Sequence, residues 1–272
     1  MTASGVWLEC FGTVTSTNDM LKELARKGAP ERGVFIAQAQ TAGKGRKGRS
    51  FYSPDDTGLY LSILLRPSFS AKEALAITTI AAVAAAKAIE AVSGKKTGIK
   101  WVNDVYLNGK KCVGILTEAA ADEGESLRYA VMGIGFNLYE PEGGFPEEIR
   151  SIAGAVFDRE ERQGEPVREL LSAAFLNEFF ALYDALPARS YMDDYRERSL
   201  AIGQMVELYS PTHEKLEGEP PVKVIGIGDA AELLVQYPDG KVRTVLSGDI
   251  SIRPLVSGSR DRDGQEGGTT WH

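Results

Sequence analysis

Apolar residues recur along the first 140 positions in short runs that are separated by polar or glycine-containing segments. Short apolar runs bounded by turn residues are typical of β-strands. They predict strands at 5–14, 34–38, 59–65, 99–102, 105–107, 112–117 and 129–134. The dipeptide Asn108-Gly109 is preferred in two-residue turns, so we expect a hairpin that pairs 105–107 with 112–117.

Helical spacing of apolar residues occurs in other parts of the chain. Ser16 and Asp19 fit a helix cap with a capping-box-like partner, and Gly28 is placed to end that first helix. Ser70 and Glu73 form a second capping box before an alanine-rich segment. Helices are therefore expected at 16–28, from 70 to about 92, from Pro166 through 182, and at 190–199.

The pattern changes after Gly203 to short strand-like runs punctuated by proline and glycine. Five runs, at 205–209, 222–227, 232–237, 242–246 and 250–252, predict a small β-barrel. We therefore divide the chain into a large domain at 1–202 and a small domain at 203–256. The polar, glycine-rich segment 257–272 is expected to be disordered.

Composition narrows the classes of function. The chain has 272 residues, a net charge of −7 and a pI near 5.1, which argues against general nucleic-acid binding. We find neither a secretory signal nor an apolar run of the ~20 residues needed to cross a bilayer. Cys10 and Cys112 have neither metal-site nor disulfide spacing. These features predict a cytoplasmic protein.

One segment is strongly basic although the chain as a whole carries a negative net charge. Four cations occur within the six residues from Lys44 to Arg49, among glycines. The glycine spacing matches a dinucleotide fingerprint and approximates a P-loop, but both need a following helix, and 50–54 cannot begin a regular one. A cationic, flexible loop remains, which suits a small anionic ligand but is also compatible with a solvated surface loop.

The loop has companions elsewhere in the chain. Five segments occur in order: Ser16-Thr17-Asn18, Gln40 to Arg49, Lys100-Trp101-Val102-Asn103-Asp104, Lys111 to Glu118 and Gly133 to Asn137. This series resembles the catalytic domain of biotin–protein ligases over about residues 10–200. The final β-rich segment, with Gly248-Asp249-Ile250, is similar to the small C-terminal domain of that family.

The resemblance implies an α+β fold. A mixed, largely antiparallel sheet flanked by helices, like that of class II synthetases, is followed in this family by a small SH3-like β-barrel. It also implies that ATP, with Mg²⁺, activates biotin to biotinyl-5′-AMP. Biotin then passes to a lysine of a biotin carboxyl carrier protein of the acetyl-CoA carboxylase type. Only fifteen residues precede Ser16, so we expect the ligase-only form without DNA binding; a homodimer is one possible assembly.

The matching positions carry over as expected site residues. Arg46 and Lys111 are expected to act catalytically by stabilising anionic charge on the phosphoryl group. Biotin is expected to contact Ser16, Thr17, Asn18, Gln40, Gly43, Lys44, Gly45, Arg46 and Lys111. ATP is expected to contact Arg49, Asn103, Asp104 and Asn137. Asp104 is the candidate for Mg²⁺ or the ribose, and the metal ligands are otherwise left open.

Two positions depart from the family pattern. Lys44 stands where the family commonly has arginine, which replaces a planar fork by a point charge. Val102 stands where the family usually has proline; this removes a constraint on φ without touching a functional group.

Simpler roles and other functions stay open from the sequence alone. Ser16 suits plain helix capping, Lys111 suits a surface hairpin, and Trp101 suits core packing. Phe51 either covers the adenylate or anchors the loop. At the level of function, a lipoate or octanoate ligase of related fold and a non-catalytic biotin-binding regulator are the alternatives.

Overall fold

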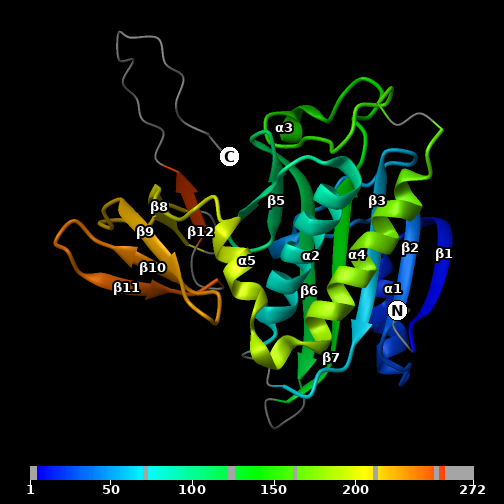
Figure 1. Ribbon diagram of the computed structural model, residues 1–272, viewed down its shortest axis with the longest axis horizontal. Helices are drawn as coiled ribbons and strands as arrows, with labels where there is room; N and C mark the ends of the chain where they lie inside the picture. The colour runs from blue at the N-terminus through cyan, green and yellow to red at the C-terminus, as the bar shows by residue number, and fades with distance from the viewer. Residues whose placement is uncertain are drawn as a thin grey trace.

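The computed structural model describes residues 5–69, 73–121, 126–161, 164–210, 214–247 and 251–254. Seven strands form the main sheet in the order β1-β2-β3-β7-β6-β5-β4 (Figure 1). They are β1 (Trp7–Val14), β2 (Gly33–Gln40), β3 (Gly58–Leu65), β4 (Gly98–Lys100), β5 (Asp104–Leu107), β6 (Lys110–Ala121) and β7 (Leu127–Asn137). Only β1 and β2 pair in parallel within this sheet as described, so the expected mixed, largely antiparallel sheet is confirmed.

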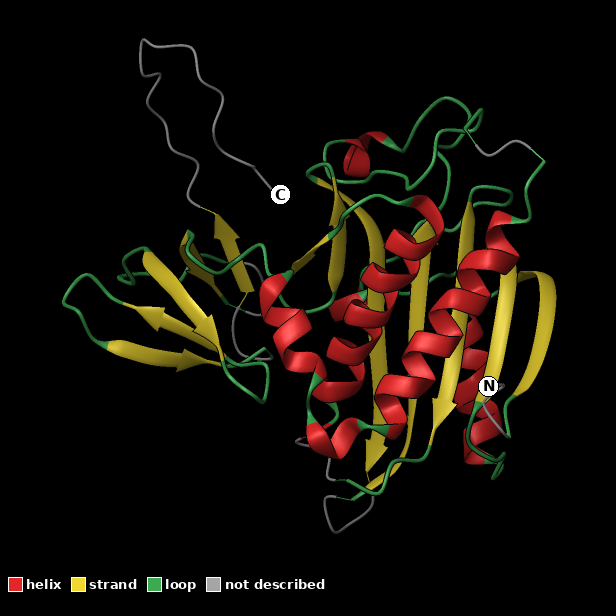
Figure 2. Cartoon of the chain, viewed as in Figure 1, coloured by secondary structure: helices red, strands yellow, loops and turns green. Residues whose placement is uncertain are grey.

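Helices cover both faces of this sheet. They are α1 (Thr17–Arg26), α2 (Leu75–Ser93), α3 (Glu147–Arg150), α4 (Val167–Asp184) and α5 (Tyr191–Glu197), with short 3-10 turns η1 (Arg46–Gly48) and η3 (Leu186–Ala188). Figures 1 and 2 show α2 and α4 side by side on one face, with α1 behind the sheet on the other. The α+β class is therefore confirmed.

The two faces of the sheet have separate apolar cores. Leu61 and Ile63 of β3 belong to the large core under α2 and α4, whereas Leu64 belongs to the smaller core under α1. This division follows from the two-residue alternation of a strand. Of the described residues, only α2 forms a helix long and apolar enough to span a bilayer, and 67% of it is buried inside the protein. Such burial is typical of a core helix.

Several predicted boundaries shift. The segment 70–72 of the second capping box lies outside the described residues, and α2 begins only at Leu75, where Ala74 gives no side-chain cap. The predicted capping box therefore stays a prediction, and the described helix begins at Leu75. The first predicted cap is present, because Ser16 Oγ accepts the Asp19 N–H at 3.5 Å. Strands β6 and β7 extend well beyond 112–117 and 129–134.

The hairpin and its neighbouring turn follow from local sequence. Asn108 and Gly109 both have positive φ, 50° and 74°, as a two-residue hairpin turn requires. The strand expected at 99–102 ends at Lys100, and the Trp101–Val102 peptide bond is cis. Trp101 is buried, and its Nε1–H donates to Ala231 O at 2.7 Å. This geometry confirms the packing role predicted for Trp101.

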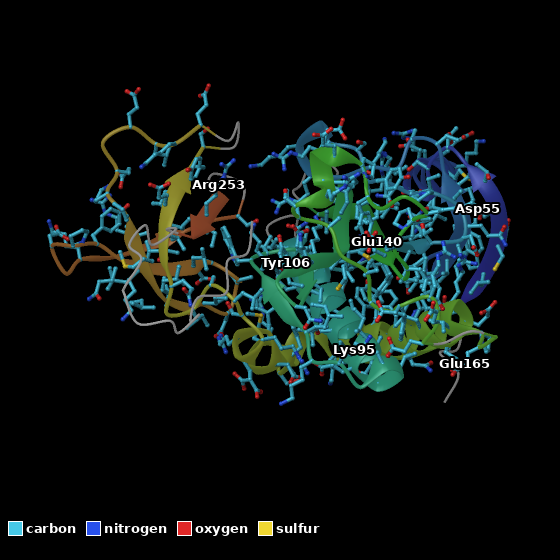
Figure 3. All side chains as sticks on the ribbon, turned by 90° about the horizontal axis from the view of Figure 1, so that it is seen from above. Asp55, Lys95, Tyr106, Glu140, Glu165 and Arg253 are labelled. Carbon is cyan, nitrogen blue, oxygen red and sulfur yellow. The ribbon has the colours of Figure 1, made fainter. Side chains whose placement is uncertain are left out.

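A second sheet holds five antiparallel strands in the order β11-β10-β9-β8-β12, which confirms the predicted number. They are β8 (Met205–Tyr209), β9 (Val222–Ile227), β10 (Leu233–Gln236), β11 (Val242–Val245) and β12 (Ser251–Pro254). In Figure 3 this small unit, with Arg253 on β12, lies beside the part of the main sheet that carries Tyr106. Barrel closure and the domain boundaries stay predictions, and 257–272 lies outside the described residues.

Candidate active site

The site is built on the sheet face that carries α1. Residues that are paired directly across neighbouring strands point to the same face of the sheet. The register of β3, β7 and β6 therefore places three rows of residues side by side on this face. The three rows are Tyr60–Gly135–Gly114, Ser62–Gly133–Leu116 and Leu64–Val131–Glu118. The third row joins the α1 core, while glycines leave bare backbone in the first two.

Two side chains pack directly against the backbone of these glycines. A Cβ on Gly133 would lie 2.1 Å from Asn18 Oδ1, and one on Gly135 would lie 2.4 Å from the Phe51 ring. A Cβ on Gly114 would also meet Phe51, at 2.8 Å. The three glycines therefore admit Asn18 and Phe51, and Phe51 anchors the loop to the sheet in this structure.

A pocket opens between these side chains, α1 and the cationic loop. Its lining residues are Ser16, Thr17, Asn18, Gln40, Lys44, Phe51, Leu61, Ser62, Gly114, Leu116, Gly133, Ile134 and Gly135. The structure thus brings five of the residues predicted for biotin to one pocket. They come from the start of α1, the end of β2 and the loop that follows β2.

Hydrogen bonds link the polar wall of the pocket. Gln40 Oε1 accepts the Thr17 backbone N–H at 2.9 Å and lies 3.1 Å from the Thr17 hydroxyl. The Thr17 and Ser62 hydroxyls are 2.7 Å apart, and Ser62 donates to Asn18 Oδ1 at 2.6 Å. Thr17, Asn18 and Ser62 are all buried. The wall is therefore a connected set of oriented polar groups.

Charged residues continue this network beside the pocket. Lys22 Nζ lies 2.6 Å from Glu118 Oε1 and 2.9 Å from Asp19 Oδ1, which also binds Lys44 Nζ at 2.5 Å. Burial alone would raise the pKa of Asp19, but hydrogen bonds from Lys44 and Lys22 outweigh it and lower that pKa. Lys44, at the departure from the family pattern, is thus held by a carboxylate on α1.

A second cluster gathers both predicted catalytic cations. Lys111 Nζ lies 2.7 Å from Asp104 Oδ1, which also accepts Asn103 Nδ2 at 3.0 Å. Arg46 Nη1 donates to Asn103 Oδ1 at 3.0 Å, and its Nη2 donates to Ser247 Oγ of the small unit at 3.2 Å. Burial lowers the pKa of Arg46, and the Asp104 charge opposes that shift. The structure therefore brings Arg46, Asn103, Asp104 and Lys111 into one cluster, and their catalytic and ATP-binding roles stay predictions.

The remaining predicted residues lie in or near the loop. Gly43 O accepts the Phe51 N–H at 2.9 Å and the Gly45 N–H donates to Arg49 O at 2.7 Å, which closes the loop on itself. The Arg49 side chain is exposed. Asn137 Nδ2 donates to Gly154 O at 3.1 Å. Its side chain is thus engaged with backbone, and contacts of Arg49 and Asn137 with ATP stay predictions.

Comparison with known proteins agrees with this arrangement. The family model for the biotin/lipoate A/B protein ligase family matches residues 10–137. The bifunctional ligase/repressor BirA of Bacillus spizizenii is 33% identical over 243 residues, covering 88% of this chain and 72% of the relative. The chain belongs to the biotin–protein ligase family. The biotin–[acetyl-CoA-carboxylase] ligase of Mycobacterium tuberculosis is 32% identical over 220 residues, covering 78% of this chain and 77% of the relative.

Solved structures give the same assignment. The biotin protein ligase of Aquifex aeolicus in complex with biotin and ATP superimposes with a TM-score of 0.74 at 26% identity. That match covers 91% of this chain and 99% of the relative. The likeness therefore includes both the main sheet and the small unit of this biotin–protein ligase family member.

Some site residues of this family member were missed by sequence reasoning. Ser62 is a fully buried polar residue inside the apolar strand β3, and that position could have signalled it. Glu118 is the last residue of the segment Lys111 to Glu118, and nothing in that segment indicates its contact with Asn18. Lys22 and Ser247 had no local signal, because their partners lie 96 and 201 residues away in sequence.

Lys100 provides a test of the electrostatics beside the site. Burial lowers the pKa of Lys100 to about 8. Since an unfolded lysine titrates near 10.4, the unfolded state binds more protons between about pH 8 and 10. The free energy of unfolding should therefore rise with pH in this window, by roughly 1–3 kcal/mol between pH 7.5 and 9.5, relative to Lys100→Met. Urea denaturation of both proteins at the two pH values measures this difference.

The exposed Lys241 of the small unit supplies the matched control. Lys241→Met should keep the pH dependence of the wild type. Equal pH dependence in the wild type and in Lys100→Met would contradict the lowered pKa of Lys100.

Proposed function

We propose that this chain activates biotin with ATP to biotinyl-5′-AMP and then transfers biotin to a lysine of a biotin carboxyl carrier protein. The observation that carries the proposal is the junction of a polar pocket with a cation cluster. Lys111 Cε lies 3.2 Å from the Cβ position of Gly114, a residue that lines the pocket. An acid bound along the pocket would therefore place its carboxylate beside Lys111 and the loop.

The first step joins two anionic groups. A carboxylate oxygen of biotin attacks the α-phosphorus of ATP, and the bond from phosphorus to the β-phosphate oxygen breaks to release pyrophosphate. Preorganised cations lower the barrier by stabilising charge on the transferring group. Arg46 and Lys111 supply two of them within one cluster, and Lys44 lines the pocket itself.

The second step consumes biotinyl-5′-AMP, the mixed anhydride that the first step forms. The ε-amino nitrogen of the acceptor lysine attacks the acyl carbon, the bond from that carbon to the AMP oxygen breaks, and the amine proton passes to solvent. Mg²⁺ accompanies ATP and neutralises phosphate charge when bound. Asp104 is the carboxylate in the Arg46–Lys111 cluster, and a single carboxylate beside phosphate and water is a common Mg²⁺ set.

The loop should respond to these ligands. Lys44 and Arg46 are occupied here by Asp19 and Asn103, and anionic substrates would compete for both cations. Backbone amide hydrogen exchange over residues 43–49 should slow when biotin and ATP are added together, because closure protects the adenylate from water. Amides of β10 serve as the reference segment. Unchanged exchange in the loop would contradict this role.

Pyrophosphate exchange tests the proposed function. The chain should incorporate labelled pyrophosphate into ATP only when biotin is present. Lipoate and octanoate, the substrates of the related ligases, serve as competing acids in parallel reactions. Exchange with lipoate or octanoate alone would assign the chain to the other branch of the family. Binding of biotin without exchange would favour a non-catalytic regulator.

The acceptor and location follow as parts of the same proposal. A relative from Mycobacterium tuberculosis is named for acetyl-CoA carboxylase, which supports a biotin carboxyl carrier protein as acceptor. Cys10 and Cys112 are free, and Cys112 is buried with its pKa raised to about 12 by burial. Free thiols agree with the cytoplasmic location that we propose.

A further inference from the structure

We infer that Glu118 is a positioning residue that sets the direction of the hydrogen bonds in the pocket wall. This inference rests on the proposed function, because it concerns how that pocket recognises biotin. Glu118 itself does not line the pocket. Its carboxylate accepts Asn18 Nδ2–H at 2.9 Å and is held from the other side by Lys22 at 2.6 Å.

The carboxylate decides how the Asn18 amide is turned. A carboxylate paired with a lysine is an acceptor only, so the group that faces it must be the amide NH₂ of Asn18. Asn18 Oδ1 consequently faces Ser62, whose hydroxyl donates to it at 2.6 Å. If the amide turned over, its carbonyl oxygen would face the Glu118 carboxylate, which is unfavourable.

The same donor-to-acceptor direction extends to the next hydrogen bonds of the pocket wall. A hydroxyl has a single proton, and Ser62 gives its proton to Asn18. Thr17 therefore gives its single hydroxyl proton to Ser62, at the shorter distance of 2.7 Å, rather than to Gln40 Oε1 at 3.1 Å. Gln40 Oε1 remains satisfied by the Thr17 backbone N–H. The bonds thus run in one direction, from Thr17 through Ser62 and Asn18 to Glu118.

This direction determines what the wall offers to a ligand. The lone pairs left over on Thr17 Oγ1, Ser62 Oγ and Asn18 Oδ1 are all acceptors. They suit the ring N–H groups of a cyclic urea. Without the carboxylate, Asn18 can turn its NH₂ toward the pocket, where it would oppose those N–H groups. Glu118 therefore acts on biotin affinity through Asn18.

Glu118→Gln in the full chain tests the inference, because glutamine keeps the shape but can donate as well as accept. We expect the KM for biotin in pyrophosphate exchange to rise about tenfold, as for one lost hydrogen bond, with the KM for ATP unchanged. Glu23→Gln on α1 is the matched control, because Glu23 forms an exposed pair with Lys27. That control should keep both KM values.

A double variant in which the amide and the carboxylate exchange places, called here the transposed pair, distinguishes an effect of hydrogen-bond direction from an effect of packing. Asn18→Asp combined with Glu118→Gln exchanges the amide and the carboxylate, so the bond is kept and an acceptor still faces Ser62. We expect the KM for biotin to return to within about threefold of the wild type. If Glu118→Gln fails to fold in circular dichroism, Ser62→Ala carries the test, with the same rise expected for biotin alone.

The outcomes separate this inference from the proposed function. A wild-type chain that shows no biotin-dependent exchange overturns the proposed function. An active wild type whose KM for biotin is unchanged by Glu118→Gln or Ser62→Ala overturns the inference alone. The same holds if the transposed pair is no better than Glu118→Gln.

Discussion

Lys111→Ala should reduce adenylate formation by two to three orders of magnitude while the chain stays folded. Removal of one preorganised charge-stabilising group typically costs about 10²–10³ in rate. The Lys111 ammonium pairs with the Asp104 carboxylate, and both side chains reach solvent, so the fold should tolerate the loss. Single-turnover formation of biotinyl-5′-AMP measures the rate, and circular dichroism monitors the fold.

The neighbouring lysine is the control for Lys111→Ala. Lys110 has the same side chain in the same strand, but its Nζ donates to the backbone oxygens of Arg150 and Ser151. Lys110→Ala should therefore form the adenylate within a few-fold of the wild-type rate. Wild-type activity in Lys111→Ala would remove Lys111 from the mechanism.

Gly133→Ala should have the next largest effect, and it should act on biotin binding. The added Cβ would lie 2.1 Å from Asn18 Oδ1, so the Asn18 side chain must leave the sheet. It would then lose its bonds to Ser62 and Glu118. Asn18 and Ser62 would then no longer present their oriented oxygens to biotin, and the loss of one to two hydrogen bonds to the ligand corresponds to about 10- to 100-fold in affinity. Calorimetric titration with biotin measures the change directly.

A glycine at another strand position controls for the substitution itself. Gly226 of β9 has negative φ, and a Cβ there would meet only Leu234 at an ordinary 3.6 Å. Gly226→Ala should leave the biotin affinity unchanged. If Gly133→Ala binds biotin as tightly as the wild type, Asn18 is not part of the biotin site.

Local features of the fold could be predicted from the sequence. Asn108-Gly109 predicted its hairpin because only residues that tolerate positive φ fit such a turn. The five strands of the small unit were predicted from their turn residues. The described start of α2 at Leu75 could not be predicted, since α2 is buried almost all round and begins there without a capping side chain. Its position depends on contact with α4 and the sheet more than on its own cap.

The site could be predicted in part. The sequence predicts three biotin-site residues from segments that occur in the order typical of the family, namely Thr17, Gln40 and Lys44. The structure brings all three to one pocket. Glu118 was missed because its effect passes through Asn18, 100 residues earlier in sequence. The register that aligns Ser62 with Gly133 is likewise non-local. Such pairings depend on tertiary packing, which a single sequence does not display.

The bare strips of backbone at Gly114, Gly133 and Gly135 have a thermodynamic consequence. This floor is held by the hydrogen bonds of three paired strands, so it needs no ordering when a ligand arrives. The entropic cost of binding should therefore fall almost entirely on the loop at 43–49. Substitutions in the loop should then change the entropy of binding, whereas substitutions in the floor should change which ligand shapes are accepted.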